Sequence, residues 1–133
     1  MAEQPPRRLR AWRGTAYEAA GAVARVGRRS ASLDGLLSRL RMRQGGFVTA
    51  WNPHGHRMPL RWNQRMQARL CEAARRLPAA AGHGTGRTSG SGWKEAHLLL
   101  GGGPGRLVVL ARRFRQAGVV LVRQGQPARL LLL

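Results

Sequence analysis

The sequence is poor in several residue types, and each scarcity excludes a class of protein. Its single cysteine, Cys71, cannot form an internal disulfide, which excludes a disulfide-stabilised secreted domain and favours a reducing compartment. No run approaches the roughly 20 apolar residues of a membrane-spanning helix. The amino-terminal arginines are not followed by the apolar segment of a secretory signal. We therefore expect a cytoplasmic protein with no membrane partner.

Acidic residues and lysine are also scarce. Asp and Glu number 5 against 24 Lys and Arg, the formal net charge is +19, and Lys94 is the only lysine. This arginine excess favours a phosphate-rich partner, because each cation that approaches a polyanion releases condensed counterions. The arginines are spread along the whole chain, however, and they accompany many Ala and Gly residues, a combination typical of a GC-rich coding bias. Nucleic-acid binding is therefore the alternative hypothesis.

Aromatic residues make up only 5% of the sequence, whereas hydrophobic residues together make up 43%. The core must therefore consist mainly of Leu, Val and Ala. A chain of 133 residues is expected to form one domain, and a domain of this size buries about two-thirds of its unfolded surface. We place that domain at residues 15–133 and expect a disordered basic leader at residues 1–14.

Hydrophobic periodicity predicts three helices. The first follows a serine cap and ends near Leu40, with four leucines at helical spacing. The second covers roughly residues 59–77, and the third follows the GGGPG turn at residues 101–105. In the second helix, the apolar stripe leaves five arginines on the other side. These are Arg61, Arg65, Arg69, Arg75 and Arg76.

Residues with high β-propensity predict about five strands, the last two joined as a hairpin by the turn QGQP. The order β-α-β-α-β-α-β-β implies an α/β domain, or a two-layer α+β domain, with a mixed sheet. The expected strands lie at residues 15–26, 47–51, 97–100, 119–122 and 128–132.

A long stretch between the second helix and the third strand has no periodicity and little to bury. It covers residues 78–92, with the sequence PAAAGHGTGRTSGSG. This composition is typical of a flexible linker. We therefore expect a flexible Gly/Ser-rich loop there.

The most distinctive polar run is VTAWNPHGHRMPLRWN, residues 48–63. Asn52 follows a strand that Pro53 ends, and ligands of open α/β sheets gather beyond strand ends. The competing interpretation is that Asn52 bonds local backbone in an Asx turn. Asn63 is expected in the first turn of the second helix, facing back toward Asn52. Because asparagine is unfavourable within a helix, some compensating contact is expected, either structural or to a ligand.

The same run carries a resemblance to a known family. The chain resembles the bacterial domain of unknown function 3293 family, from about Thr15 to the end. The resemblance implies a small single domain and marks positions, but it implies no activity. Two positions depart from the pattern, since the family has a glycine at Arg115 and commonly an acidic residue at Lys94. The residues that carry the resemblance are Thr49, Ala50, Trp51, Asn52 and Pro53, then Asn63 and Arg65, Trp93 and Glu95, and Phe114 and Gln116.

Other motifs assign no chemistry. His54 and His56 form an H-x-H pair, but no third ligand has recognisable spacing, so neither a metal nor a cofactor is expected. The GGGPG turn lacks the Lys-Ser/Thr of a phosphate loop. No serine triad and no pair of catalytic carboxylates is recognisable, which leaves open whether the chain is an enzyme. Glu95 is expected among arginines, either in a structural ion pair or as a base or anchor for a cationic group.

We therefore expect a module that binds an unidentified small ligand or protein at the Trp51-Asn52-Pro53 strand exit. The alternative is a nucleic-acid-associated protein whose second helix contacts phosphates through its five arginines, with Trp12, Trp51 or Trp93 stacking on unpaired bases. An enzyme that uses the same polar residues is a third hypothesis. The candidate ligand-binding residues are Trp51, Asn52, Asn63, Glu95 and Gln116.

Overall fold

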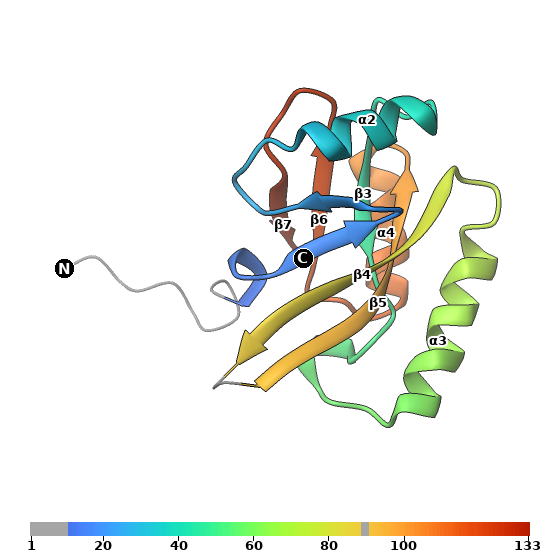
Figure 1. Cartoon of the computed structure of the whole chain (residues 1–133). Coiled ribbons are helices and arrows are strands. Elements are labelled where there is room, and N and C mark those ends of the chain that lie inside the picture. Colours follow the sequence, from blue (N-terminus) through green and yellow to red (C-terminus); the bar gives the residue numbers. More distant parts are fainter. Residues whose placement is uncertain (1–10, 89–90) are drawn as a thin grey trace.

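The computed structural model describes residues 11–88 and 91–133 (Figure 1). Its strands are β1 (Ala16–Ala19), β2 (Ala22–Ala24), β3 (Gln44–Val48), β4 (Ala79–Thr88), β5 (Ser91–Gly101), β6 (Gly118–Arg123) and β7 (Arg129–Leu132). Its helices are α2 (Ala31–Arg39), α3 (Leu60–Ala73) and α4 (Pro104–Arg113), with the 3-10 helix η1 (Pro53–Gly55) and further helical residues at 11–13. The seven strands form one sheet in the order β2-β1-β4-β5-β3-β6-β7.

The predicted sheet was wrong in size and in type. We expected a mixed sheet of about five strands with three helices, whereas the sheet has seven strands and its strand pairs are antiparallel. The single strand expected at residues 15–26 is a hairpin, because Ala20 and Gly21 both adopt positive φ and reverse the chain. The predicted helices lie where α2, α3 and α4 are, but η1 and residues 11–13 add helical segments.

The loop expected at residues 78–92 was also wrong, since β4 and β5 form a long hairpin there. Alternate glycines of β4 share one face of the sheet with Trp93 and His97 of β5. A Cβ at Gly84 would lie 2.8 Å from Cε1 of His97, and a Cβ at Gly86 would lie 2.6 Å from Cζ2 of Trp93. The glycines therefore leave room for rings from the neighbouring strand. Residues 89–90, and residues 1–10 of the expected leader, lie outside the described residues.

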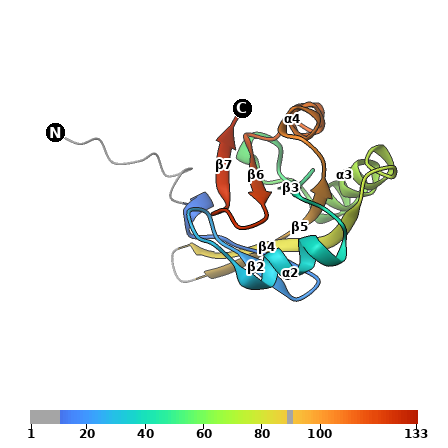
Figure 2. The same cartoon turned by 90° about the horizontal axis from the view of Figure 1, so that it is seen from above.

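The sheet curls until its two edges meet. Val26, which follows β2, forms a parallel bridge with Ala128, which precedes β7. The amide of Gly27 donates a hydrogen bond of 2.7 Å to the carbonyl of Ala128. In Figure 2 the strands β7, β6, β3 and β5 follow an arc, with α3 and α4 outside it. The curl gives the sheet a concave face, and this face holds the candidate site.

Two clusters of apolar side chains cover the two faces of the sheet. Phe47, Leu99 and Val120 pack on the concave face with Tyr17 of β1 and with the leucines of α2. Leu70 of α3 belongs to the second cluster, with α4 and the opposite faces of β3, β5 and β6. β3 is buried on both faces, as expected for a strand with few polar residues. None of the helices in the described ranges is long and apolar enough to cross a membrane.

Candidate functional site

A cleft of about 810 Å³ opens at one end of the curled sheet. Five segments meet there, namely residues 11–17, the exit of β3, the loop into α3 with the first turn of that helix, the first half of β5 and the link from α4 to β6. α2 lies at the other end, where its Asp34 carboxylate accepts a hydrogen bond from Gly125 in the turn after β6. The mouth of a strongly curled sheet is a common position for a ligand site.

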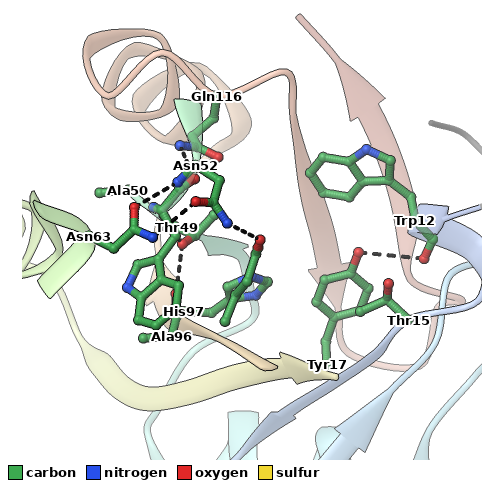
Figure 3. A network of polar contacts seen from close by, with 12 residues as sticks. Trp12, Thr15, Tyr17, Thr49, Ala50, Asn52, Asn63, Ala96, His97 and Gln116 are labelled. Atoms are coloured by element: carbon green, nitrogen blue, oxygen red, sulfur yellow. Dashed lines mark hydrogen bonds and ion pairs between the residues drawn. The ribbon is translucent and has the colours of Figure 1, made fainter. Parts of the chain in front are cut away.

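Asn52 is the centre of a hydrogen-bond network in this cleft (Figure 3). Its backbone is left-handed, with φ 46° and ψ 65°, a conformation that asparagine tolerates better than most residues do. Its Oδ1 accepts from the Met58 amide and from Nδ2 of Asn63, each at 2.9 Å. Its Nδ2 donates to Oε1 of Glu95 at 2.8 Å. The Asn52 side chain therefore joins the β3 exit to α3 and to β5.

Asn63 holds the loop between β3 and α3 in place. It is only 2% exposed, and its Oδ1 accepts the backbone N–H of Asn52 at 3.0 Å. Its Nδ2 donates to Asn52 and, at 3.3 Å, to the carbonyl of Met58. Both amide hydrogens of Asn63 are thus used within the protein. The contact expected to compensate for an asparagine in this helix is a structural one.

Glu95 differs from the two asparagines because part of its hydrogen-bonding capacity is unused. Oε1 accepts from Asn52, whereas Oε2 accepts no hydrogen bond from a described residue, and Nε2 of His97 lies 3.8 Å from it. The side chain is 27% exposed and lines the cleft. Arg57 lines the same cleft, and no arginine whose side chain the structure describes forms an ion pair with this carboxylate.

Aromatic rings form much of the remaining wall. Tyr17 lies against His97 with ring centroids 5.5 Å apart and against Trp12 at 6.4 Å. Burial raises the pKa of the Tyr17 hydroxyl well above its ordinary value, the Thr15 hydroxyl partly opposes this rise, and the negative charge of Glu95 adds to it. Tyr17 therefore stays protonated at neutral pH and can act as a hydrogen-bond donor but not as a nucleophile. His97 is 6% exposed, and its Nδ1 is buried without a partner among the described residues.

Gln116 closes the side of the cleft formed by the α4–β6 link. Its Nε2 donates to the carbonyls of Trp51 and Phe114, each at 3.1 Å. Trp51 is held further by its amide, which donates to Oγ1 of Thr49 at 3.0 Å. Figure 3 shows Gln116, Asn52 and Asn63 on one side, and Trp12 with Tyr17 on the other. The five candidate residues from the sequence therefore line one cleft, although they come from three separate regions of the chain.

Thr15, Tyr17 and His97 also line this cleft, and they were not predicted as site residues from the sequence. His97 was interpreted only as part of an apolar strand. A signal for it existed, because Trp93, Glu95 and His97 alternate along β5 and therefore share one face of the sheet. The glycines of β4 alternate in the same way opposite them. The two patterns together predict a hairpin with one polar and aromatic face.

The arginines of α3 lie away from this cleft. Arg61, Arg65, Arg69, Arg75 and Arg76 are all exposed, and none of them lines the cleft. Arg75 forms an ion pair of 3.0 Å with Glu72, and the other four form none within the described part of the chain. The cations that do line the cleft are Arg57 and Lys94.

Within residues 11–88 and 91–133 there is no group of three or more His, Cys, Asp or Glu side chains that could hold a metal ion, and His54 and His56 are both exposed.

The comparisons with known proteins agree with the resemblance of the TAWNP run. No curated protein and no solved structure matches the chain. The family model described as a protein of unknown function (DUF3293) matches residues 48–119, more than half of the chain and all five candidate residues, so the chain belongs to this family.

Proposed function

We propose that the domain binds a small ligand in the cleft at the Trp51-Asn52-Pro53 exit of β3. The observation that carries this proposal is the Glu95 carboxylate, whose Oε1 is held by Asn52 and whose Oε2 has no hydrogen-bond donor among the described residues. A partly buried carboxylate loses hydration and regains free energy when a donor pairs with it. A ligand with an N–H or O–H group would supply that donor.

The surroundings of Glu95 support a site that is formed before the ligand arrives. Asn52, Asn63 and Met58 bond one another, so that the amide that orients Glu95 is itself fixed. Three non-glycine residues near the cleft have positive φ, and strained backbone of this kind is concentrated at functional sites. They are Asn52, His54 and Arg115, and the amide of His54 donates to the carbonyl of Arg115 at 2.8 Å.

The location that we propose is the cytoplasm. The single cysteine, Cys71, is exposed and free, which supports a compartment in which thiols stay reduced. A small molecule is the proposed partner in the cleft, because the enclosed polar groups are suited to a few directed hydrogen bonds.

A screen of small molecules by saturation-transfer NMR tests the cleft proposal. The wild-type protein is expected to bind molecules with N–H donors. The Glu95→Gln variant is expected to remain folded but no longer to bind these molecules. Glu72→Gln is the matched control, because it removes the same charge from an exposed side chain on α3. Equal binding by all three proteins would reject the site, as would the absence of any bound molecule.

A second candidate function is nucleic-acid binding, which is favoured by the exposed arginines of α3. Arg61, Arg65 and Arg69 recur at i, i+4 and i+8 and so lie along one side of the helix. Like charges at this spacing destabilise a helix by about 0.2–0.5 kcal/mol per pair. Phosphates that bind along this side would relieve the repulsion.

Fluorescence anisotropy with labelled RNA and DNA tests this second candidate. Replacement of Arg61, Arg65 and Arg69 by Gln is expected to weaken binding. The logarithm of the binding constant should also fall less steeply with the logarithm of the salt concentration, by the contribution of about three phosphate contacts. Replacement of Arg25, Arg28 and Arg29 by Gln is the control, since these arginines are also exposed but lie beside β2. The candidate is rejected if no nucleic acid binds at low salt, or if both triple variants lose the same affinity.

A further inference from the structure

We propose that the ligand of this cleft is a guanine nucleotide, either free or within a single strand. Its base edge would bind Glu95 and its phosphate would bind Arg57. This inference rests on the proposed function of the cleft and names the ligand class. Glu95 and Arg57 both line the cleft, where Glu95 is held by Asn52 and lies beside His97, whereas Arg57 is exposed.

The opposite charges of Glu95 and Arg57 in one cleft select a ligand with two different groups. Glu95 offers acceptor oxygens and so requires a donor. Arg57 lines the cleft and forms no ion pair with a described carboxylate. A fully charged guanidinium prefers phosphate, which it binds with paired hydrogen bonds. The ligand should therefore carry N–H groups at one end and an anion at the other.

The aromatic side chains that line the cleft favour a flat ring. Trp51, Trp93, Trp12 and Tyr17 line the cleft. The ring of Trp12 is inclined by only 23° to the ring of Tyr17. Bases stack on such side chains irrespective of sequence. The volume of about 810 Å³ falls within the range of roughly 300–1,000 Å³ that is typical of small-molecule sites. A nucleotide combines the ring, the donor edge and the anion.

Among the bases, guanine matches a carboxylate best. Its N1–H and its N2 amino group lie side by side and can both donate to one carboxylate, in the paired geometry that makes charge-assisted hydrogen bonds strong. Adenine and cytosine each place a ring acceptor beside their amino group, and that acceptor would face the carboxylate. Uracil has one N–H between two carbonyl groups. Glu95 is therefore the expected specificity-determining residue.

Tryptophan fluorescence and calorimetric titrations test the proposal with GMP, AMP, CMP, UMP and guanosine. GMP is expected to bind at least about tenfold more tightly than the other three nucleotides, which corresponds to one well-made charged hydrogen bond. Glu95→Gln should weaken GMP binding about 10- to 100-fold, because its amide turns a donor toward the base. Glu72→Gln should leave binding unchanged, and thermal unfolding checks that each variant is folded.

The Arg57→Gln variant tests the proposed contact between Arg57 and the phosphate. This variant should weaken GMP binding and should leave guanosine binding as it is in the wild type. A tetranucleotide with one guanine distinguishes the two sources of the ligand. A strand is assigned if it binds more tightly than GMP with the same dependence on Glu95, and a free nucleotide if it binds more weakly.

Two results would overturn the inference in different ways. If no nucleotide binds but other N–H donors bind and depend on Glu95, the ligand class is wrong and the proposed cleft function stands. An amino acid is the first such donor to try, since its ammonium group would match Glu95 and its carboxylate would match Arg57. If nothing binds to the wild type in a manner that depends on Glu95, both proposals fail.

Discussion

At the scale of single residues, the cleft depends on a series of hydrogen bonds in which one side chain positions the next. Asn63 bonds the backbone and side chain of Asn52, and Asn52 then bonds Glu95. The sequence placed Asn52 and Asn63 near each other because the expected helix began between them. It could not show that Glu95 is the third member, since a contact between residues 52 and 95 depends on a strand order that periodicity does not reveal.

The left-handed backbone of Asn52 leads to the first prediction. Asn52→Ala should lower the free energy of unfolding by about 2–4 kcal/mol, because the Met58 amide and the Asn63 side chain lose a buried acceptor. Asn52→Gly should be about 1 kcal/mol less destabilising than the alanine variant, because glycine adopts φ 46° without strain. Urea unfolding measures both, and Gln64→Ala on the exposed side of α3 is the control. Equal stabilities of the two Asn52 variants would show that the left-handed backbone is not retained.

Tyr17 gives a prediction about pH, and it is the only tyrosine of the chain. Its pKa is raised in the folded state by burial, so the folded protein holds the hydroxyl proton to a higher pH than the unfolded protein does. Stability from this residue is complete below the ordinary tyrosine pKa of about 10 and is lost as the pH rises above it.

The absorbance of tyrosinate during an alkaline titration checks this directly. The folded protein should form none at a pH slightly above 10, whereas the protein in denaturant should titrate with the ordinary value of about 10. Tyr17→Phe should remove the absorbance change and flatten the loss of stability in that pH range. Normal titration of Tyr17 in the folded protein would mean that its ring is not buried beside Glu95.

At the scale of elements, the helices were easier to predict than the strands. The leucines of α2 recur at helical spacing, and Ser30 accepts a hydrogen bond from the Leu33 amide, as expected of an N-cap. β4 was missed because its concave face carries glycines instead of side chains. The rings that cover this face belong to β5, so the apolar pattern of a strand is divided between two strands.

One glycine of β4 and one glycine of α4 lead to predictions of opposite sign. Gly84→Ala should lower the free energy of unfolding by about 1–3 kcal/mol, because the added methyl group would press on the His97 ring. Gly105→Ala should raise it by about 0.5–1 kcal/mol, because nothing lies near its Cβ and the residue is in the first turn of α4. Chemical denaturation measures the free energy of unfolding of both variants. Wild-type stability in Gly84→Ala would mean that His97 does not lie over β4.

At the scale of the whole molecule, curvature and charge are the two dominant features. The contact between Val26 and Ala128 brings the sheet edges together, and residues as far apart in the sequence as Trp12 and Gln116 line one cleft. No local pattern predicts such a long-range closure. The charge, by contrast, follows directly from composition, and +19 on 133 residues must produce strong self-repulsion in the folded state.

This charge predicts that added salt stabilises the protein. The midpoint of thermal unfolding should rise as sodium chloride increases from low to physiological concentration, because screening lengths fall to about 8 Å there. Phosphate should raise the midpoint more than chloride does at equal ionic strength, since it can bind between neighbouring arginines. A midpoint that is insensitive to both salts would contradict a destabilising role for the charge.

We propose above all that Glu95 presents an open carboxylate oxygen to a ligand in the cleft. The most direct test is a crystal structure of the protein soaked with a collection of small nitrogen heterocycles and amines. We predict density for a bound molecule between the aromatic walls, with a nitrogen within hydrogen-bond distance of Oε2 of Glu95. A structure in which Oε2 is bonded by the protein itself, and in which soaked molecules bind only elsewhere, would contradict the claim.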